Sequence, residues 1–423
     1  MKSFKIITFG CKVNTYESEF MKENLLNSGF FMSETPNIYI INTCSVTNAA
    51  DTKSKKAMRK VKRDNPHAIL VVCGCMAEHL KEELIKEDID ILIGNKDKSK
   101  IGDILNNYLK TKEKYIHFIP NKNLEFERMQ ISKFTNQTRA FIKIQDGCDS
   151  YCSYCIIPKL RGNIRSKDFN DAVTEISGLV NNNHKEIVLT GIHTGKFGKG
   201  LNYELADLIE VVSKNEDLKR IRISSIEITE LTELFFDLLK NNPKICNHLH
   251  IPLQSGSDSI LKAMNRKYNT AGYEKIINKI RTIRPDISIT TDVIVGFPSE
   301  TDEYFKETIN FCEKIKFSKI HVFPYSLRSG TKAALMNNQI PSEIKKKRAK
   351  ELNALSIKLE RDYYLRFLNK EVEVLIETVK EKVSIGHTSN YLKVHINKKL
   401  KANELVNVKI TKVSKNIAYG EKI

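Results

Sequence analysis

The chain has 423 residues, more than one ordinary hydrophobic core accommodates, so two or three domains are expected. Its formal net charge of +18 favours a polyanionic partner such as nucleic acid, with solvated lysine-rich helix faces as the alternative. No apolar run approaches the ~20 residues that a membrane span needs, and the chain begins with an expected strand rather than a secretory signal. A membrane or secreted protein is therefore not expected, and nine cysteines indicate a reducing cytoplasm, where thiols bind metals or stay free.

Residues 1–118 are expected to form an α/β domain around a parallel sheet. Cys11, Cys44 and Cys75 each follow one of its first three strands, whose carboxyl ends meet at one edge of the sheet. Three thiolates gathered there predict a [4Fe–4S] cluster with one open iron, and three unrelated free thiols are the alternative. Cys73 is expected in the core. Strands are predicted at residues 5–9, 37–41, 68–73 and 89–93, and helices at 17–28, 49–62, 77–87 and 98–109.

The second domain, residues 134–365, is expected to be a partial (β/α)6 barrel. Residues 113–137 have weak periodicity and are interpreted as the connection that leads into it. Catalytic groups in such barrels gather on the loops that follow the strands. The predicted strands are residues 140–144, 186–189, 220–225, 248–252, 288–295 and 319–324, and the helices are 169–181, 203–212, 230–239, 259–264 with 273–283, and 303–315.

The loop after the first expected barrel strand carries Cys148, Cys152 and Cys155 in a C-x-x-x-C-x-x-C pattern. Thiolates at this spacing converge on one soft metal centre. Structural zinc wants four ligands, whereas a [4Fe–4S] cluster held by three thiolates leaves one iron open for a small molecule. The pattern therefore favours an iron–sulfur cluster over a zinc site. His193 stays unassigned, because structural histidines are commoner than ligands, and Cys246 and Cys312 are expected in the core.

The C-terminal part changes character after a predicted lysine-rich helix over residues 342–368. Short strands are expected at 371–377, 392–396 and 404–412, within a third domain at 370–423. This segment carries eleven lysines against six glutamates. A small basic β-barrel is a common RNA-binding device, and a cap that only packs on the central barrel is the alternative.

Together the three segments resemble the radical S-adenosylmethionine (SAM) methylthiotransferase family, and the last one resembles a TRAM domain. The motifs closest to its MtaB branch are residues 10–14, 41–47, 144–148, 156–158, 161–166 and 189–195. The resemblance implies that Cys148, Cys152 and Cys155 hold a SAM-binding [4Fe–4S] cluster and that Cys11, Cys44 and Cys75 hold an auxiliary one, about eight irons in all. It also implies that Tyr154 packs near the SAM adenine, Gly191 meets the SAM amino group, and Gly296 lets backbone approach the adenine.

The resemblance further implies conversion of N6-threonylcarbamoyladenosine at position 37 of tRNA to its 2-methylthio form. The expected partners are a tRNA anticodon loop and an electron donor such as flavodoxin or ferredoxin. Sister branches act on N6-isopentenyladenosine in tRNA or on a ribosomal-protein aspartate, and a non-catalytic electron-transfer or RNA-binding protein is the alternative from another class. Arg161 and Arg165 are assigned equally to substrate or SAM binding and to structural ion pairs. Residues 227–229 depart from the family pattern, which often has proline after Glu227.

Overall fold

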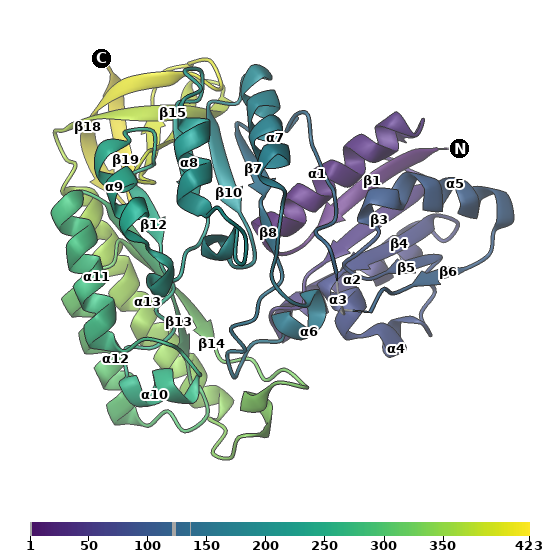
Figure 1. Cartoon of the computed structure of the whole chain (residues 1–423), viewed down its shortest axis with the longest axis horizontal. Helices are drawn as coiled ribbons and strands as arrows, with labels where there is room; N and C mark the ends of the chain where they lie inside the picture. The colour runs from purple at the N-terminus through teal and green to yellow at the C-terminus, as the bar shows by residue number, and fades with distance from the viewer. Residues whose placement is uncertain (1, 121–123, 136) are drawn as a thin grey trace.

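The computed structural model describes residues 2–120, 124–135 and 137–423. It places an N-terminal sheet domain beside a central barrel-like body, with a small β-barrel at one end of that body (Figure 1). This arrangement confirms the expected α/β multidomain fold. Within the described residues, no helix is long and apolar enough to cross a membrane.

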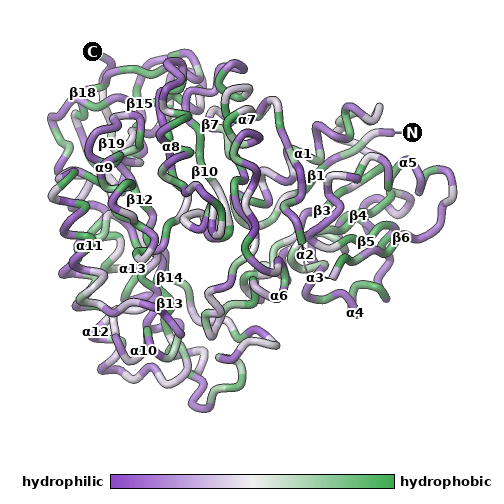
Figure 2. Tube along the Cα trace, in the orientation of Figure 1, coloured by the Kyte–Doolittle hydropathy of each residue, from purple (hydrophilic) through white to green (hydrophobic). Residues whose placement is uncertain are grey.

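The N-terminal domain is a parallel sheet in the order β2-β1-β3-β4-β5-β6. Its central strand β3, Ile38–Thr43, is buried throughout, because alternate residues pack under helices on opposite faces. Figure 2 shows the hydrophobic residues concentrated along these strands. The other strands are β1 Ser3–Thr8, β2 Phe31–Met32, β4 Ile69–Gly74, β5 Ile91–Ile93 and β6 Tyr115–His117, and the helices are α1 Lys12–Asn27, α2 Asn48–Asp64, α3 Cys75–His79, α4 Lys81–Leu84, η1 Lys98–Lys100 and α5 Ile101–Thr111.

The first helix begins at Lys12, five residues before the expected start. Its first turn is polar, so apolar periodicity did not reveal it. The consequence is that Cys11 occupies the N-cap position of α1, directly at the sheet edge.

The central body contains the expected parallel strands, divided into two sheets ordered β11-β10-β7 and β12-β13-β14. Backbone hydrogen bonds from Ile221 N to Lys244 O (2.7 Å) and from Cys246 N to Ile221 O (2.8 Å) join them. No pairing joins β7 to β14 within the described residues, so the barrel is open on that side. The strands are β7 Arg139–Lys143, β8 Gln145–Asp146, β9 Arg165–Ser166, β10 Glu186–Thr190, β11 Arg220–Ile223, β12 His248–His250, β13 Ser288–Val295 and β14 Lys319–Pro324.

Amphipathic helices cover the outer face of the barrel and bury their apolar sides against its strands. They are α7 Phe169–Asn181, α8 Leu205–Ser213, α9 Glu233–Asn241, α11 Thr270–Ile283, α12 Asp302–Ile315 and α13 Ser342–Leu365. The shorter helices are α6 Ile157–Arg161, which packs against the N-terminal domain, α10 Asp258–Ala263, η2 Thr194–Lys196, η3 Ile228–Glu230 and η4 Lys332–Leu335. The departure at residues 227–229 is the start of η3, where Glu227 and Glu230 form a capping box.

The C-terminal domain is a closed barrel in the order β15-β16-β17-β19-β18. It packs on the amino ends of the central strands, where Arg220 Nη1 donates to His387 O (3.0 Å) and Arg139 Nη1 donates to Tyr391 Oη (2.8 Å). The sequence analysis did not identify β16, a short strand in which Val383, Ile385 and His387 alternate with small residues. The strands are β15 Glu371–Lys380, β16 Val383–Thr388, β17 Lys393–Ile396, β18 Leu405–Ser414 and β19 Ile417–Lys422.

Candidate functional site

The three N-terminal thiols converge at the carboxyl edge of the sheet. Cys11 caps α1, Cys44 follows β3, and Cys75 begins α3. Gly10, at φ 110°, approaches so closely that a Cβ there would lie 2.7 Å from Cys44 Cβ. Burial is the main cause that raises the pKa of Cys44 to about 11, and the neighbouring Cys75 and Cys11 contribute to the same shift. The structure therefore brings the three predicted ligands to one place.

Side-chain hydrogen bonds from the two motifs hold these loops together. Asn14 Nδ2 donates to Phe9 O (2.8 Å) and to Thr43 O (2.9 Å), so the Cys11 loop is tied to the Cys44 loop. Thr43 Oγ1 accepts from Met76 N (3.1 Å), which ties the Cys44 loop to the helix that Cys75 begins. Asn14 and Thr43 therefore position the three thiols.

Replacing Asn14 with alanine is expected to impair loading of the N-terminal site. The change removes the donor to one buried and one part-buried carbonyl group, at a cost of about 1–3 kcal/mol for a buried carbonyl left unsatisfied, and removes the tie between two loops. Supporting residues of metal sites typically change metal affinity by about 10–100-fold. Iron analysis after reconstitution should show reduced iron with SAM cleavage retained.

The control for this variant is Asn107→Ala, at an exposed position of α5, which should bind iron like the wild type. Full iron content in Asn14→Ala would show that Asn14 does not position the thiols.

The barrel thiols lie on the loop between β8 and α6. Cys155 N donates to Cys152 O (3.0 Å), and Cys148 N donates to Gly162 O (3.0 Å), which closes the loop back on itself. Burial is the main cause that raises the pKa of Cys155 to about 12, and the neighbouring Cys152 and Cys148 contribute to the same shift. This second trio is therefore also mutually close.

Cationic side chains contact two of the barrel thiols. His193 Nδ1 lies 3.5 Å from Cys148 Sγ, and Arg266 Nη1 donates to Cys152 Sγ (3.1 Å). Although burial opposes its charged form, hydrogen bonds with Cys148 and Glu230 raise the pKa of His193 to about 10. Glu227 pairs with Arg266 on the side away from the thiol. His193 and Arg266 thus provide positive charge where thiolates are expected.

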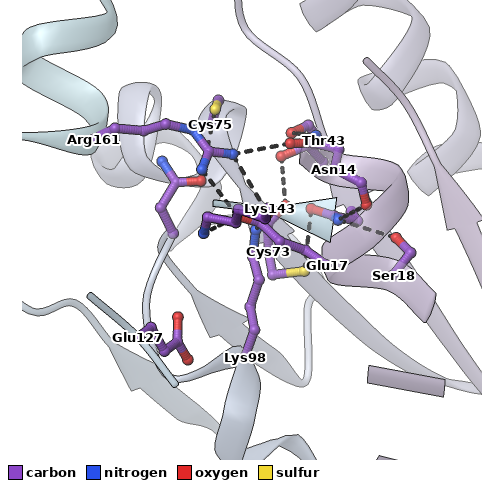
Figure 3. Close-up of polar contacts among 12 residues, drawn as sticks. Asn14, Glu17, Ser18, Thr43, Cys73, Cys75, Lys98, Glu127, Lys143 and Arg161 are labelled. Atoms are coloured by element: carbon purple, nitrogen blue, oxygen red, sulfur yellow. Dashed lines mark hydrogen bonds and ion pairs between the residues drawn. The ribbon is translucent and has the colours of Figure 1, made fainter. Parts of the chain in front are cut away.

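A buried ionic network joins the N-terminal domain to the barrel beside the first thiol set (Figure 3). Glu17 accepts from Arg161 Nη1 (2.9 Å) and Lys143 Nζ (2.8 Å) and also pairs with Lys98. Asp146 accepts from Lys143 (2.8 Å) and Arg161 (3.1 Å), and Arg165 lies 3.3 Å from it. The two open assignments of Arg161 and Arg165 are thereby decided, because both arginines pair with structural carboxylates.

In this network two carboxylates share four cations, which leaves buried positive charge. Arg161 lies close enough to the first thiol set that it lowers the pKa of Cys11 and Cys44, against the larger opposing effect of burial. Cys75 in turn helps raise the pKa of Arg161, after Glu17 and Asp146. The N-terminal site is therefore built to receive an anionic group such as a cluster of thiolates.

Contacts between loops bring the two thiol sets together. Cys75 packs against Ile156, which directly precedes α6, and against Leu160, which lies within α6. This helix follows Cys155 in the chain. Asn95 Nδ2 donates to Leu160 O (3.0 Å). On the other side, Arg328 donates to Ser45 Oγ (2.7 Å), next to Cys44.

Two adjoining cavities lie at this junction, and Asp292 and Phe323 line both. The larger, about 730 Å³, fills the barrel interior and is lined by Cys11, Gly191 and residues of the C-terminal barrel. The smaller, about 190 Å³, is lined by Tyr154, Cys155, Gln254, Ile294 and Tyr325, among others.

The predicted glycines have different surroundings. Gly191 faces the larger cavity, and a Cβ there would lie 2.9 Å from Gln145 Oε1. Gly296, at φ 70°, is approached instead by Lys345, whose Cγ would lie 2.4 Å from an added Cβ. Its amide donates to Glu300 Oε1 (2.9 Å). Backbone geometry thus requires glycine at position 296, and its approach to adenine stays a prediction.

Protein-family models match most of the chain. They are an uncharacterized protein family, UPF0004, over residues 3–94, the radical SAM superfamily over residues 142–312, and a TRAM domain over residues 365–423. The chain is 41% identical over 400 residues to the threonylcarbamoyladenosine tRNA methylthiotransferase MtaB of Bacillus subtilis, covering 92% of this chain and 88% of that protein. The corresponding protein of Thermotoga maritima is 38% identical over 93% of this chain and 91% of its own. The chain belongs to the radical SAM methylthiotransferase family.

More distant comparisons agree with this methylthiotransferase assignment. A tRNA-2-methylthio-N(6)-dimethylallyladenosine synthase of Clostridium tetani is 35% identical over 100% of this chain and 96% of its own. The structure of the radical SAM methyltransferase TsrM from Kitasatospora setae superposes with a TM-score of 0.56 at 12% identity, covering 76% of this chain and 73% of that one. At this identity the superposition supports the fold alone.

The methylthiotransferase is therefore an enzyme that uses SAM and [4Fe–4S] clusters, as the sequence analysis expected. The electron-carrier and structural-zinc alternatives are set aside. The side chains fit these cofactors, because each thiol set provides soft ligands beside buried cations that offset their charge. Cys73, Cys246 and Cys312 are buried in the core, as predicted.

The sequence analysis missed several groups around the methylthiotransferase site. His193 was left unassigned, and Arg266, Glu230 and Gln254 were not singled out. A further cluster consists of His250, Asp292 and His321 in the larger cavity, whose ligand atoms lie within 4.8 Å of one another. Their shared signal is position, since most of them lie in or just beyond a barrel strand, at the end where sites form.

Proposed function

We propose that this enzyme converts N6-threonylcarbamoyladenosine at position 37 of tRNA to its 2-methylthio derivative. The observation that carries the proposal is the placement of two three-thiol sets at one junction, with Cys11 itself facing the cavity that fills the barrel. The names of the two MtaB relatives supply the substrate. The proposed ligands are Cys148, Cys152 and Cys155 for the SAM-binding cluster, and Cys11, Cys44 and Cys75 for the auxiliary cluster.

Two clusters suit this reaction because C2–H of adenine is neither acidic nor electrophilic enough for acid–base chemistry. When bound, the clusters and SAM supply hydrogen abstraction and the methylthio group. The protein's own part is binding and orientation. Tyr154 and the smaller cavity are proposed to hold the adenine of SAM, the backbone at Gly191 its amino group, and Gly296 to shape the nearby turn.

The proposed partner is a tRNA anticodon loop, with nucleotide 37 turned out into the cavity. The C-terminal barrel supports this proposal through exposed lysines such as Lys398, Lys399 and Lys401. Lysine contacts to phosphates make affinity fall with salt. A small electron donor such as flavodoxin or ferredoxin is proposed as reductant.

Mass spectrometry of tRNA nucleosides from a strain lacking this protein tests the proposed function. The 2-methylthio form of N6-threonylcarbamoyladenosine should disappear while the unmethylthiolated nucleoside accumulates, because the proposed reaction converts the second nucleoside into the first. Restoring the gene should restore the product. Loss of 2-methylthio-N6-isopentenyladenosine instead would assign the enzyme to the sister branch.

A further inference from the structure

The larger cavity is lined by all three domains. Cys11 and Lys12 enter from the N-terminal domain, strands β10 to β14 form its walls, and Tyr391 and neighbouring residues of the C-terminal barrel form its far end. Most of the lining side chains carry a polar group. Several of these groups already have partners within the chain: His250 Nδ1 lies 2.9 Å from Thr290 Oγ1, and the hydroxyl groups of Ser288 and Ser318 lie 2.7 Å apart.

Three basic side chains of this lining have an acidic partner. Lys319 lies 3.1 Å from Glu360, His250 lies 3.3 Å from Asp292, and His387 lies 3.0 Å from Glu377. Lys12 and Lys393 differ, because neither ammonium has a hydrogen-bond or ion-pair partner among the residues that the structure describes. The cavity therefore contains positive charge that nothing in the described part of the chain neutralises.

Lys12 is the more restrained of the two. It is the first residue of α1, adjacent to Cys11, and its ammonium lies within electrostatic reach of Tyr391, Arg222 and Arg139. Both guanidinium groups already have a carboxylate partner, Glu186 for Arg222 (2.7 Å) and Glu377 for Arg139 (3.0 Å), so the ammonium of Lys12 is a charge that an entering anion can still pair with. Tyr391, held at φ 71° and stacked 4.4 Å from Arg222, closes the far end of the cavity.

The proposed substrate supplies one such anion. In N6-threonylcarbamoyladenosine, C2 and C6 flank N1 of adenine, and the N6 substituent ends in a free threonine carboxylate. If C2 approaches the cluster that Cys11 ligates, that carboxylate comes to the part of the cavity that Lys12 faces. An isopentenyl substituent has no anion to offer there.

We propose that Lys12 binds the threonine carboxylate of the N6-threonylcarbamoyl group and thereby selects this substrate over N6-alkyl adenosines. The inference rests on the proposed function and extends it to a specificity-determining residue. The ammonium donates hydrogen bonds to the carboxylate, and the polar walls receive the urea and hydroxyl groups.

The test combines Lys12→Met with a change to the substrate. Anticodon stem-loop RNAs carrying N6-threonylcarbamoyladenosine, or its carboxamide, are compared as substrates of the reconstituted holoenzyme by kcat/KM and by equilibrium Kd. The wild type should prefer the acid by about 10–100-fold, the range for a hydrogen bond to a charged group. In Lys12→Met the preference for the acid over the carboxamide should fall to about onefold. An RNA that carries isopentenyladenosine should bind Lys12→Met as tightly as it binds the wild type.

The preference ratio, not the absolute rate, is the decisive readout, because Lys12 neighbours a cluster ligand. Iron content and 5′-deoxyadenosine formation check that Lys12→Met retains both clusters. Lys110→Met, which removes an exposed lysine on α5, should keep the wild-type preference. The inference would be overturned if Lys12→Met kept the preference for the acid, or if the wild type showed no such preference. It would also be overturned if Lys393→Met alone abolished the preference. A wild type that modifies neither RNA would instead contradict the proposed function.

Discussion

Replacing Cys44 with alanine is expected to abolish methylthio transfer while leaving SAM cleavage intact, and replacing Cys152 should abolish both. The two thiols belong to separate sets, each mutually close and each beside its own cation, Arg161 or Arg266. Loss of a cluster ligand should reduce the activity that depends on that cluster by more than about 100-fold. Even replacing a residue that only supports a metal ligand typically lowers metal affinity or activity by about 10–100-fold.

The measurement pairs iron content with product analysis. About eight irons per wild-type chain should fall to about four in Cys44→Ala, with 5′-deoxyadenosine still formed from SAM. Cys73→Ala is the matched control, because Cys73 is a fully buried thiol at the end of β4 that belongs to neither set. Methylthiolated product from Cys44→Ala, or four or fewer irons in the wild type, would contradict the two-cluster mechanism.

Periodicity and strand-end position were sufficient to predict the fold class and to group the six cysteines. Both are local signals. A parallel sheet places every strand's carboxyl end at one edge, so Cys11, Cys44 and Cys75 could be grouped without knowing any contact. The same logic placed Gly191 at the cavity.

What could not be predicted depends on pairs that are distant in sequence. Glu17 and Arg161 are 144 residues apart, and nothing local to either one identifies its partner. Lys12 looks like an ordinary solvated lysine until the C-terminal barrel closes the cavity opposite it. Gly296 matched a family pattern, yet its nearest neighbour is Lys345 of α13, an approach that depends on how that helix packs.

Arg161 is therefore the residue whose replacement should most affect the folded enzyme. Arg161→Met removes one of the two cations that contact both Glu17 and Asp146 inside a buried network, the other being Lys143. Removing one member of a buried ion pair typically costs about 3–5 kcal/mol, and because Lys143 still pairs with both carboxylates, we expect a loss toward the lower end of that range. The guanidinium also holds Asn14 Oδ1 (3.0 Å), which belongs to the loop system around the N-terminal thiols.

The expected result is a lower urea midpoint for the reconstituted enzyme together with reduced iron at the N-terminal site. Arg59→Met, at an exposed position of α2, removes the same charge and should change neither value, since surface pairs contribute about 0–1 kcal/mol. Arg161→Lys keeps the positive charge but loses the bidentate donor geometry of the guanidinium. Its urea midpoint and iron content should therefore lie between those of Arg161→Met and Arg59→Met. If Arg161→Met unfolded like the wild type yet still lost iron, Arg161 would act on the thiols alone and not on the junction between the domains.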